Sequence, residues 1–260
     1  MGIGIHIGTQ IGGSSQGTGG SPTSQVANWL ATAGLTGNPI SAWSDGTNIL
    51  TATGTARPAV GTDFEPGVSV DFDGTSDVME IIPNPISSTV GSLGLVFKTG
   101  TLTDVHTIIE SWTTVGTVRT KFYIDTGEFV FASGALSLTC NEAVATDDTE
   151  YQVLIVFDGT DVRIWINDVE QTFNEIGSPP LHWFNDDELY VGATDVPDDF
   201  FPGSIGVIRF WDAVLSAGER TTWSNYANGT WLTQVDYTYL RPGGVDTYLR
   251  PGGVDQYIRP

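Results

Sequence analysis

The fold is decided near the C-terminal end by the stretch Phe201-Pro-Gly-Ser-Ile-Gly-Val-Ile-Arg-Phe-Trp-Asp-Ala-Val-Leu-Ser-Ala-Gly-Glu219. Its middle, Ile205–Trp211, is an apolar run typical of a buried strand. Its end, Ser216-Ala-Gly-Glu219, is a capping box, in which the serine oxygen and the glutamate carboxylate satisfy free backbone donors of a first helical turn. This stretch therefore predicts a strand followed by a short helix, the one convincing helix signal of the chain.

Upstream of this stretch, short strand patterns alternate with turn signals. The turn residues Asp125-Thr-Gly127 lie between two apolar segments and predict a hairpin, and Asp158-Gly-Thr160 predicts a second one. So much β-structure with a single helix predicts an all-β fold, a two-sheet antiparallel jelly-roll sandwich. The expected strands are Val68–Asp73, Leu93–Lys98, Thr107–Trp112, Phe122–Ile124, Phe129–Phe131, Tyr151–Phe157, Val162–Asn167, Glu188–Gly192 and Ile205–Trp211.

The charge of the chain restricts its partners. The 260 residues carry a net charge of −21, and the two lysines are Lys98 and Lys121. Such an acidic body repels nucleic acid and anionic membrane surfaces, and no apolar run is long enough to cross a bilayer. The single cysteine, Cys140, can form no intrachain disulfide and is expected to be a small core residue.

The sequence predicts an extended arm at each end of the chain. Residues 1–22 combine an alternating apolar segment with a Gly/Ser linker, and residues 233–260 repeat the unit Val-Asp-x-Tyr-Leu-Arg-Pro-Gly-Gly. One unit cannot bury its own Tyr and Leu, so we expect these arms to gain order on another surface, a floppy tail being the alternative. Residues 23–232 then form one domain. The predicted assembly contacts are Ile3, Ile5, Ile7, Tyr239, Arg241, Tyr248, Arg250, Tyr257 and Arg259.

Three segments carry a family resemblance. The first runs from Ile40 to Asp77 and contains Phe72-Asp-Gly74, the second is the hairpin Phe157–Asn167, and the third is Val191–Glu219. In this order they resemble the laminin G-like, concanavalin A-like jelly-roll superfamily, in the form common in phage and bacterial surface proteins. The resemblance covers nearly all of residues 25–230 and implies a jelly-roll sandwich.

The resemblance also requires a search for catalytic residues, because the superfamily includes glycoside hydrolases. The string Glu-x-Asp-x-x-Glu of retaining members is absent, and Glu188-Leu-Tyr190 has a tyrosine where the aspartate should be. The histidines, His6, His106 and His182, have no partners at metal-ligand spacing. The sequence therefore predicts no catalytic residue, no metal site and no enzyme.

Calcium remains an alternative to the prediction of no cofactor, because relatives often hold it with loop carboxylates. The Asp73-Gly74 segment is more simply explained as a β-turn in which Asp73 caps its own backbone. The candidate calcium ligands are Asp71, Asp73 and Asp77, or Asp195, Asp198 and Asp199.

Three functions fit these observations. The first hypothesis is a non-enzymatic structural protein of a tailed-phage virion, which decorates a capsid, forms a head fibre or joins a tail. Its partners would be other virion subunits, in a homo-oligomer such as a trimer, with contacts multiplied by the repeats. The alternative is a carbohydrate-binding adhesin that binds a cell-surface glycan; a polysaccharide-cleaving hydrolase or lyase is the third. For the adhesin, the candidate sugar-stacking residues are Trp112, Trp183 and Phe184, although burial in the core is their default interpretation.

Overall fold

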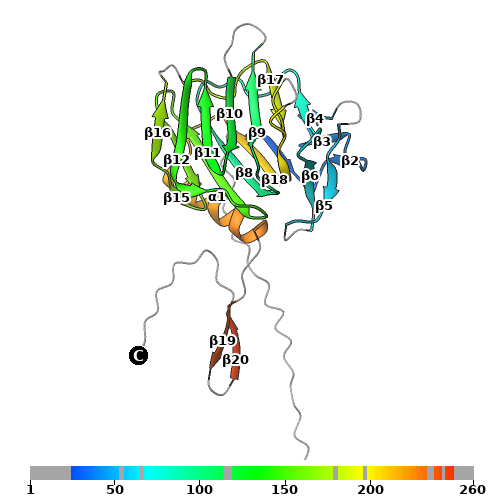
Figure 1. The fold of residues 1–260 in the computed structure, drawn as a ribbon, viewed down its shortest axis with the longest axis vertical. Helices are drawn as coiled ribbons and strands as arrows, with labels where there is room; N and C mark the ends of the chain where they lie inside the picture. The colour runs from blue at the N-terminus through cyan, green and yellow to red at the C-terminus, as the bar shows by residue number, and fades with distance from the viewer. Residues whose placement is uncertain are drawn as a thin grey trace, which may run out of the picture.

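The structure is a computed structural model, and it describes residues 25–52, 56–64, 67–113, 119–177, 181–195, 198–232, 237–241 and 244–248. Two antiparallel sheets face each other and one helix lies outside them (Figure 1). The predicted all-β, two-sheet sandwich with one C-terminal helix is therefore confirmed. The predicted N-terminal arm lies outside the described residues.

Sheet A is the sheet that carries the helix, and β18 pairs with three of its other strands. This strand, Pro202–Trp211, pairs with β8 and β6 and also with β1. Its strands follow the order β15-β14-β13-β8-β18-β6-β5, with β1 added against β18. Their bounds are β1 Gln25–Leu30, β5 Ala59–Gly61, β6 Ser69–Asp73, β8 Gly91–Thr99, β13 Glu150–Phe157, β14 Val162–Ile166 and β15 Val169–Glu170.

Sheet B forms the other layer, in the order β16-β12-β11-β10-β9-β17-β7-β4-β3-β2. The predicted hairpin at Asp125–Glu128 joins β10 to β11, where Thr126 and Gly127 both have positive φ, as a tight hairpin turn requires. The bounds are β2 Leu35–Thr36, β3 Ala42–Ser44, β4 Ile49–Thr51, β7 Met79–Ile81, β9 Val105–Trp112, β10 Arg119–Asp125, β11 Glu128–Ser133, β12 Leu136–Val144, β16 Phe173–Ile176 and β17 Glu188–Val191.

The core lies between the sheets and is rich in aromatic rings. Phe122 and Phe129 stack with their centroids 6.1 Å apart, and Phe97 contacts Phe129 edge-on. Alternate residues of each strand reach this core because successive side chains point to opposite faces. Cys140 is buried there, as predicted, and burial raises the pKa of its thiol to about 12.

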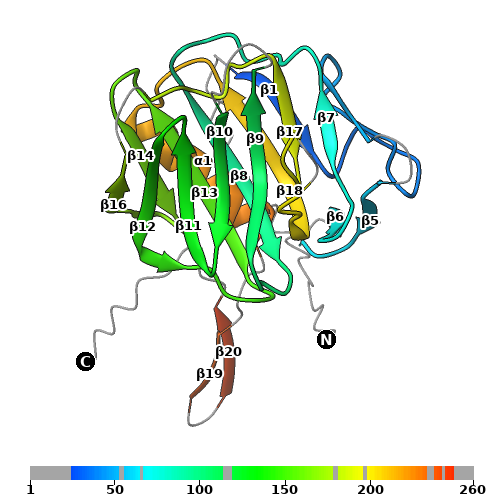
Figure 2. The same cartoon turned by 45° about the horizontal axis from the view of Figure 1, so that its top comes forward.

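The helix α1, Ala217–Thr230, begins at the predicted capping box. The Glu219 carboxylate accepts from the Ser216 backbone N–H at 2.8 Å, and the Ser216 hydroxyl accepts from the Glu219 N–H. The helix packs on the outer face of sheet A (Figure 2), where Trp223 lies directly over Gly94. A Cβ atom at Gly94 would meet the indole at 2.7 Å, so this contact needs glycine. The helix α1 thus covers part of the outer face of sheet A.

Two units of the C-terminal repeat form a separate hairpin, drawn apart from the sandwich in Figures 1 and 2. Strand β19, Tyr237–Arg241, pairs antiparallel with β20, Gly244–Tyr248. The sequence predicts extended units that order only on another surface; in the structure two units pair with each other. In the sequence, Pro-Gly-Gly separates the units, and glycine readily adopts backbone conformations that other residues avoid.

Candidate functional site

The outer face of sheet B presents charged and aromatic side chains in register. Glu80 of β7 lies opposite Tyr190 of β17, Tyr190 lies opposite Glu110 of β9, and Glu110 lies opposite Lys121 of β10. Their neighbours in sequence, such as Phe122, point into the core, so strand alternation directs these four outward. One step along the strands, a second row is formed by Glu188, Trp112 and Arg119. We call these seven residues the sheet B cluster.

Glu110 is the most perturbed group of the cluster. Its side chain is fully buried, and none of the described residues donates a hydrogen bond to either carboxylate oxygen. Burial raises the pKa of Glu110 to about 7, although Arg119 Nη1, 3.6 Å from Oε1, favours the charged form. A buried carboxyl with a raised pKa beside a fixed cation makes this position a candidate functional site.

The loop between β17 and β18 covers part of the cluster with further carboxylates. Asp195, with a side chain only 5% exposed, forms an ion pair with Arg119 Nη2 at 2.7 Å. Asp199 lies 3.7 Å from Lys121 Nζ, and its backbone carbonyl accepts from the Thr107 N–H at 2.7 Å. Burial raises the pKa of Asp199, while Lys121 opposes this shift. Arg119 and Lys121 therefore hold this loop against the sheet.

Aromatic rings lie beside both cations. Arg119 lies over the half-buried Trp112 ring at 5.8 Å, and Lys121 lies over the Tyr123 ring at 4.2 Å. The Tyr190 hydroxyl donates to Glu188 Oε2 at 2.6 Å, and burial raises the pKa of this tyrosine. The surface thus combines ring faces with hydrogen-bonding groups, as ligand sites do.

The structure places the predicted aromatic candidates in two environments. Trp112 lies in the cluster, as the sugar-stacking hypothesis requires. Trp183 and Phe184 are 1% and 0% exposed and pack in the core, so their default interpretation is correct and they form no sugar-stacking surface. Sequence reasoning missed Glu110 and Arg119. The signal for Glu110 was a glutamate inside the apolar run Thr107–Trp112.

The carboxylates predicted as calcium ligands are engaged in other contacts. Although burial acts to raise it, hydrogen bonds from Thr75 and Ser76 lower the pKa of Asp73 to about 2, and its carboxylate caps the β-turn as expected. Asp77 accepts from the Asp73 N–H at 2.9 Å, and the Ser69 hydroxyl donates to Asp71 at 2.5 Å. Asp198 accepts from the Thr194 hydroxyl. In the part of the chain that the structure describes, no three His, Cys, Asp or Glu residues are grouped to hold a metal ion.

Three of the nine predicted assembly residues lie among the described residues, and six do not. Tyr239 and Arg241 belong to β19, and Tyr248 belongs to β20. The other six, Ile3, Ile5, Ile7, Arg250, Tyr257 and Arg259, lie outside the described residues. Their role stays a prediction.

The described helix is not long and apolar enough to span a membrane.

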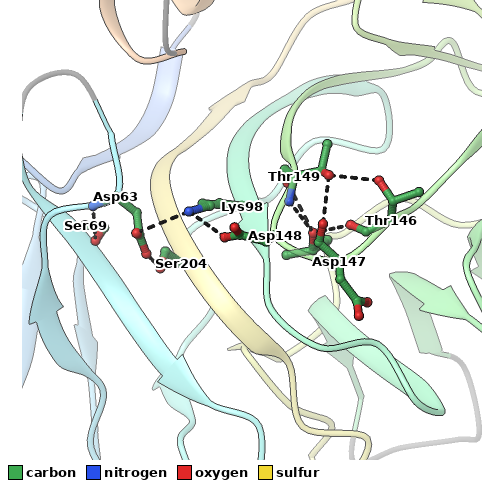
Figure 3. Close-up of polar contacts among 9 residues, drawn as sticks. Asp63, Ser69, Lys98, Thr146, Asp147, Asp148, Thr149 and Ser204 are labelled. Atoms are coloured by element: carbon green, nitrogen blue, oxygen red, sulfur yellow. Dashed lines mark hydrogen bonds and ion pairs between the residues drawn. The ribbon is translucent and has the colours of Figure 1, made fainter.

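The second lysine lies on the outer face of sheet A, in a different environment (Figure 3). Lys98 of β8 contacts Asp148 at 2.7 Å and Asp63 at 3.5 Å, and the Ser204 hydroxyl also donates to Asp63. The Asp148 side chain is 83% exposed, so solvent screens this pair. We interpret it as a structural contact near the end of β8.

Comparison with known proteins identifies a matching family model and solved structures of similar fold. The model of the concanavalin A-like lectin/glucanases superfamily, in a laminin G-like form, matches residues 73–219. Domain 4 of AbnA, an extracellular arabinanase of Geobacillus stearothermophilus solved with arabinotriose, is 17% identical with a TM-score of 0.61; the match covers 77% of this chain and 98% of that domain. Trypanosoma rangeli sialidase with sialic acid is 12% identical with a TM-score of 0.59, over 79% of this chain and 33% of the sialidase. No curated protein sequence matches the chain. At these identities the likeness shows the fold.

Proposed function

This chain belongs to the concanavalin A-like lectin/glucanases superfamily, and from that premise we propose that it binds carbohydrate on the outer face of sheet B. The proposal rests on one observation above all: Trp112 lies half-buried under Arg119, beside the buried Glu110. An aromatic ring supplies a stacking surface for a sugar ring, and the guanidinium supplies several donors for its hydroxyl groups. The arabinanase domain of the same fold, solved with arabinotriose, supports this choice over the virion hypothesis.

The charges of the face select the class of glycan. Arg119 and Lys121 are the cations of the cluster, and both already pair with loop carboxylates. Among the other five cluster residues, Glu80 and Glu188 add carboxylates to the surface. An anionic sugar would meet this negative surface without a free cation, so the ligand is a neutral glycan.

Binding is tested by calorimetry with neutral oligosaccharides selected on a glycan array. We expect Trp112→Ala and Arg119→Gln to weaken binding about tenfold or more, since buried aromatic and arginine anchors dominate interfaces. Lys98→Gln, on the other sheet, is the matched control and should bind like the wild type. Unchanged affinity in both cluster variants would contradict the proposal. Assays for new reducing ends on the same sugars address catalysis, and we expect none.

A second candidate function is assembly through the C-terminal arm, as in a virion protein. The hairpin β19–β20 favours it, because in the described chain each of these strands pairs only with the other. Such free strand edges accept a strand of a neighbouring subunit. Deleting residues 236–260 should lower the oligomeric state measured by light scattering. The virion partners and the trimer remain proposals, and an unchanged mass after the deletion contradicts the docking role.

A further inference from the structure

A groove of about 410 Å³ lies on the outer face of sheet A, between α1 and the hairpin β13–β14. Its volume falls within the roughly 300–1,000 Å³ of small-molecule sites. It lies on a different sheet from the sheet B cluster and shares no residue with it. The lining residues used below are Gln152, Leu154, Trp165, Asp168 and Arg220.

The groove contains a buried acceptor without a donor. Gln152 is 2% exposed, and none of the described residues donates a hydrogen bond to its Oε1. The other side of its amide is fixed, because Nε2 donates to Asp168 Oδ1 at 3.1 Å. Asp168 is itself held by Asn228 Nδ2 at 2.9 Å. A buried acceptor left unpaired costs about 1–3 kcal/mol, so this oxygen is suited to a hydroxyl group supplied from the groove.

An aromatic wall stands beside this acceptor. Trp165 is half-buried, and the Arg220 guanidinium lies 4.6 Å from its ring centroid. Arg220 Nη1 also donates to the Leu215 carbonyl at 3.2 Å, which fixes the guanidinium at the start of α1. Leu154, directly opposite Trp165 on β13, adds an apolar surface. The groove therefore offers an apolar wall and hydrogen-bonding groups within one small volume.

We propose that this groove is a second binding site, which takes a neutral, hydroxyl-rich ring such as one sugar unit. The ring packs against Trp165 and Leu154, and one hydroxyl donates to Gln152 Oε1. A charged ligand is disfavoured, because Asp168 repels anions and the nearby Arg220 repels cations while both are already engaged. This step rests on the proposed function: with glycan bound at the sheet B cluster as well, the protein would carry one sugar site on each sheet.

The test follows the indole N–H signals of the eight tryptophans by NMR in the full-length protein. The signals of Trp165 and Trp112 are assigned by Trp165→Phe and Trp112→Phe. Maltotriose, cellotriose, xylotriose and arabinotriose are the probes. We expect at least one of them to shift the Trp165 signal to saturation, with a midpoint independent of Trp112→Phe.

A matched pair of variants tests the acceptor. Gln152→Met removes Oε1 at constant length and should weaken binding at Trp165 about tenfold. Gln171→Met is the control, since Gln171 is also buried with an unpaired Oε1 but does not line the groove. The proposal is overturned if no probe moves the Trp165 signal, or if Gln152→Met binds like Gln171→Met. Movement at Trp165 without movement at Trp112 would support the groove independently of the sheet B cluster.

Discussion

Sheet A and sheet B each turn one face to the core, and their outer faces bury opposite charges in different ways. On sheet A, under α1, Arg209 lies 4.5 Å from the Tyr226 ring centroid, and its Nε donates to Asn28 Oδ1 at 2.8 Å. On sheet B, Glu110 is buried, and neither of its carboxylate oxygens accepts a hydrogen bond from the described residues. Burial lowers the pKa of Arg209 and raises that of Glu110, in each case against the charged form.

The difference separates a structural charge from a candidate functional one. The Arg209 guanidinium is surrounded by the faces of Trp211, Trp223 and Tyr226, which favour a cation, so it completes the helix–sheet contact. Glu110 has no comparable set of partners, so burial disfavours its charged form and raises its pKa. The outer face of sheet A thus holds a buried charge inside a helix–sheet contact, whereas that of sheet B holds a buried carboxyl that accepts no hydrogen bond from the described residues.

The largest expected effect comes from removing the helix contact on sheet A. Trp223 is 2% exposed and packs edge-on against Trp211, with centroids 5.6 Å apart. Trp223→Ala should lower the free energy of unfolding by about 3–5 kcal/mol, measured in urea, because it leaves a cavity over Gly94. Tyr123→Ala, at a half-buried position on sheet B, is the comparison and should cost clearly less. If both variants lost the same free energy of unfolding, the helix contact on sheet A would contribute no more stability than the outer face of sheet B.

The second prediction concerns the pH dependence of stability. The folded pKa of Glu110 is raised to about 7 from its usual 4.5, so the native state keeps a proton that the unfolded chain releases. Its contribution to stability is therefore full below pH 4.5, falls as the pH rises to about 7 and is level above that. The total change is on the order of 3 kcal/mol.

Glu110→Gln should remove this pH-dependent loss. We expect the variant to gain stability over the wild type at pH 8 and to gain little at pH 4.5, in urea unfolding at both values. Arg209→Met on sheet A is the control, because arginine stays charged throughout this range, so its effect should not change with pH. If Glu110→Gln changes the free energy of unfolding by the same amount at both pH values, the carboxyl is not protonated in the folded state.

A smaller effect is expected at the start of α1. Ser216→Ala removes the hydroxyl that accepts from the Glu219 N–H and should cost about 1 kcal/mol, measured by thermal unfolding. Thr222→Ala, at a helix position outside the cap, should cost less. If both variants had the same melting temperature, the capping box would contribute nothing to holding the helix on sheet A.

The smallest effect is expected at Lys98. Its contacts with Asp63 and Asp148 are partly exposed, so Lys98→Gln should cost about 0.5 kcal/mol in low salt and almost nothing in high salt. Lys121→Gln on sheet B is the counterpart, and it should also release the Asp199 loop, seen as faster amide exchange at Thr107. An equal salt response without this change in exchange would contradict the role given to Lys121.

Local sequence determined much of the fold. The alternation of Val162, Ile164 and Ile166 with Arg163 and Trp165 specified which face of β14 is buried, and the structure agrees. The hairpin at Thr126 and Gly127 and the capping box at Ser216 were predictable for the same reason. Each depends on residues within a few positions of one another, where backbone conformation and side-chain direction follow from residue type.

Only the tertiary structure decided the sites. The capped turn at Asp73 could be read from its neighbours, whereas Glu110, Arg119 and Asp195 meet because three separate segments converge on one face of sheet B. The groove likewise needs α1 to lie against β13 and β14 so that Arg220 reaches Trp165. Contacts of this kind depend on strand order and on what covers each sheet. Burial, and with it the pKa of Glu110, is a property of that packing and cannot be read from a local pattern.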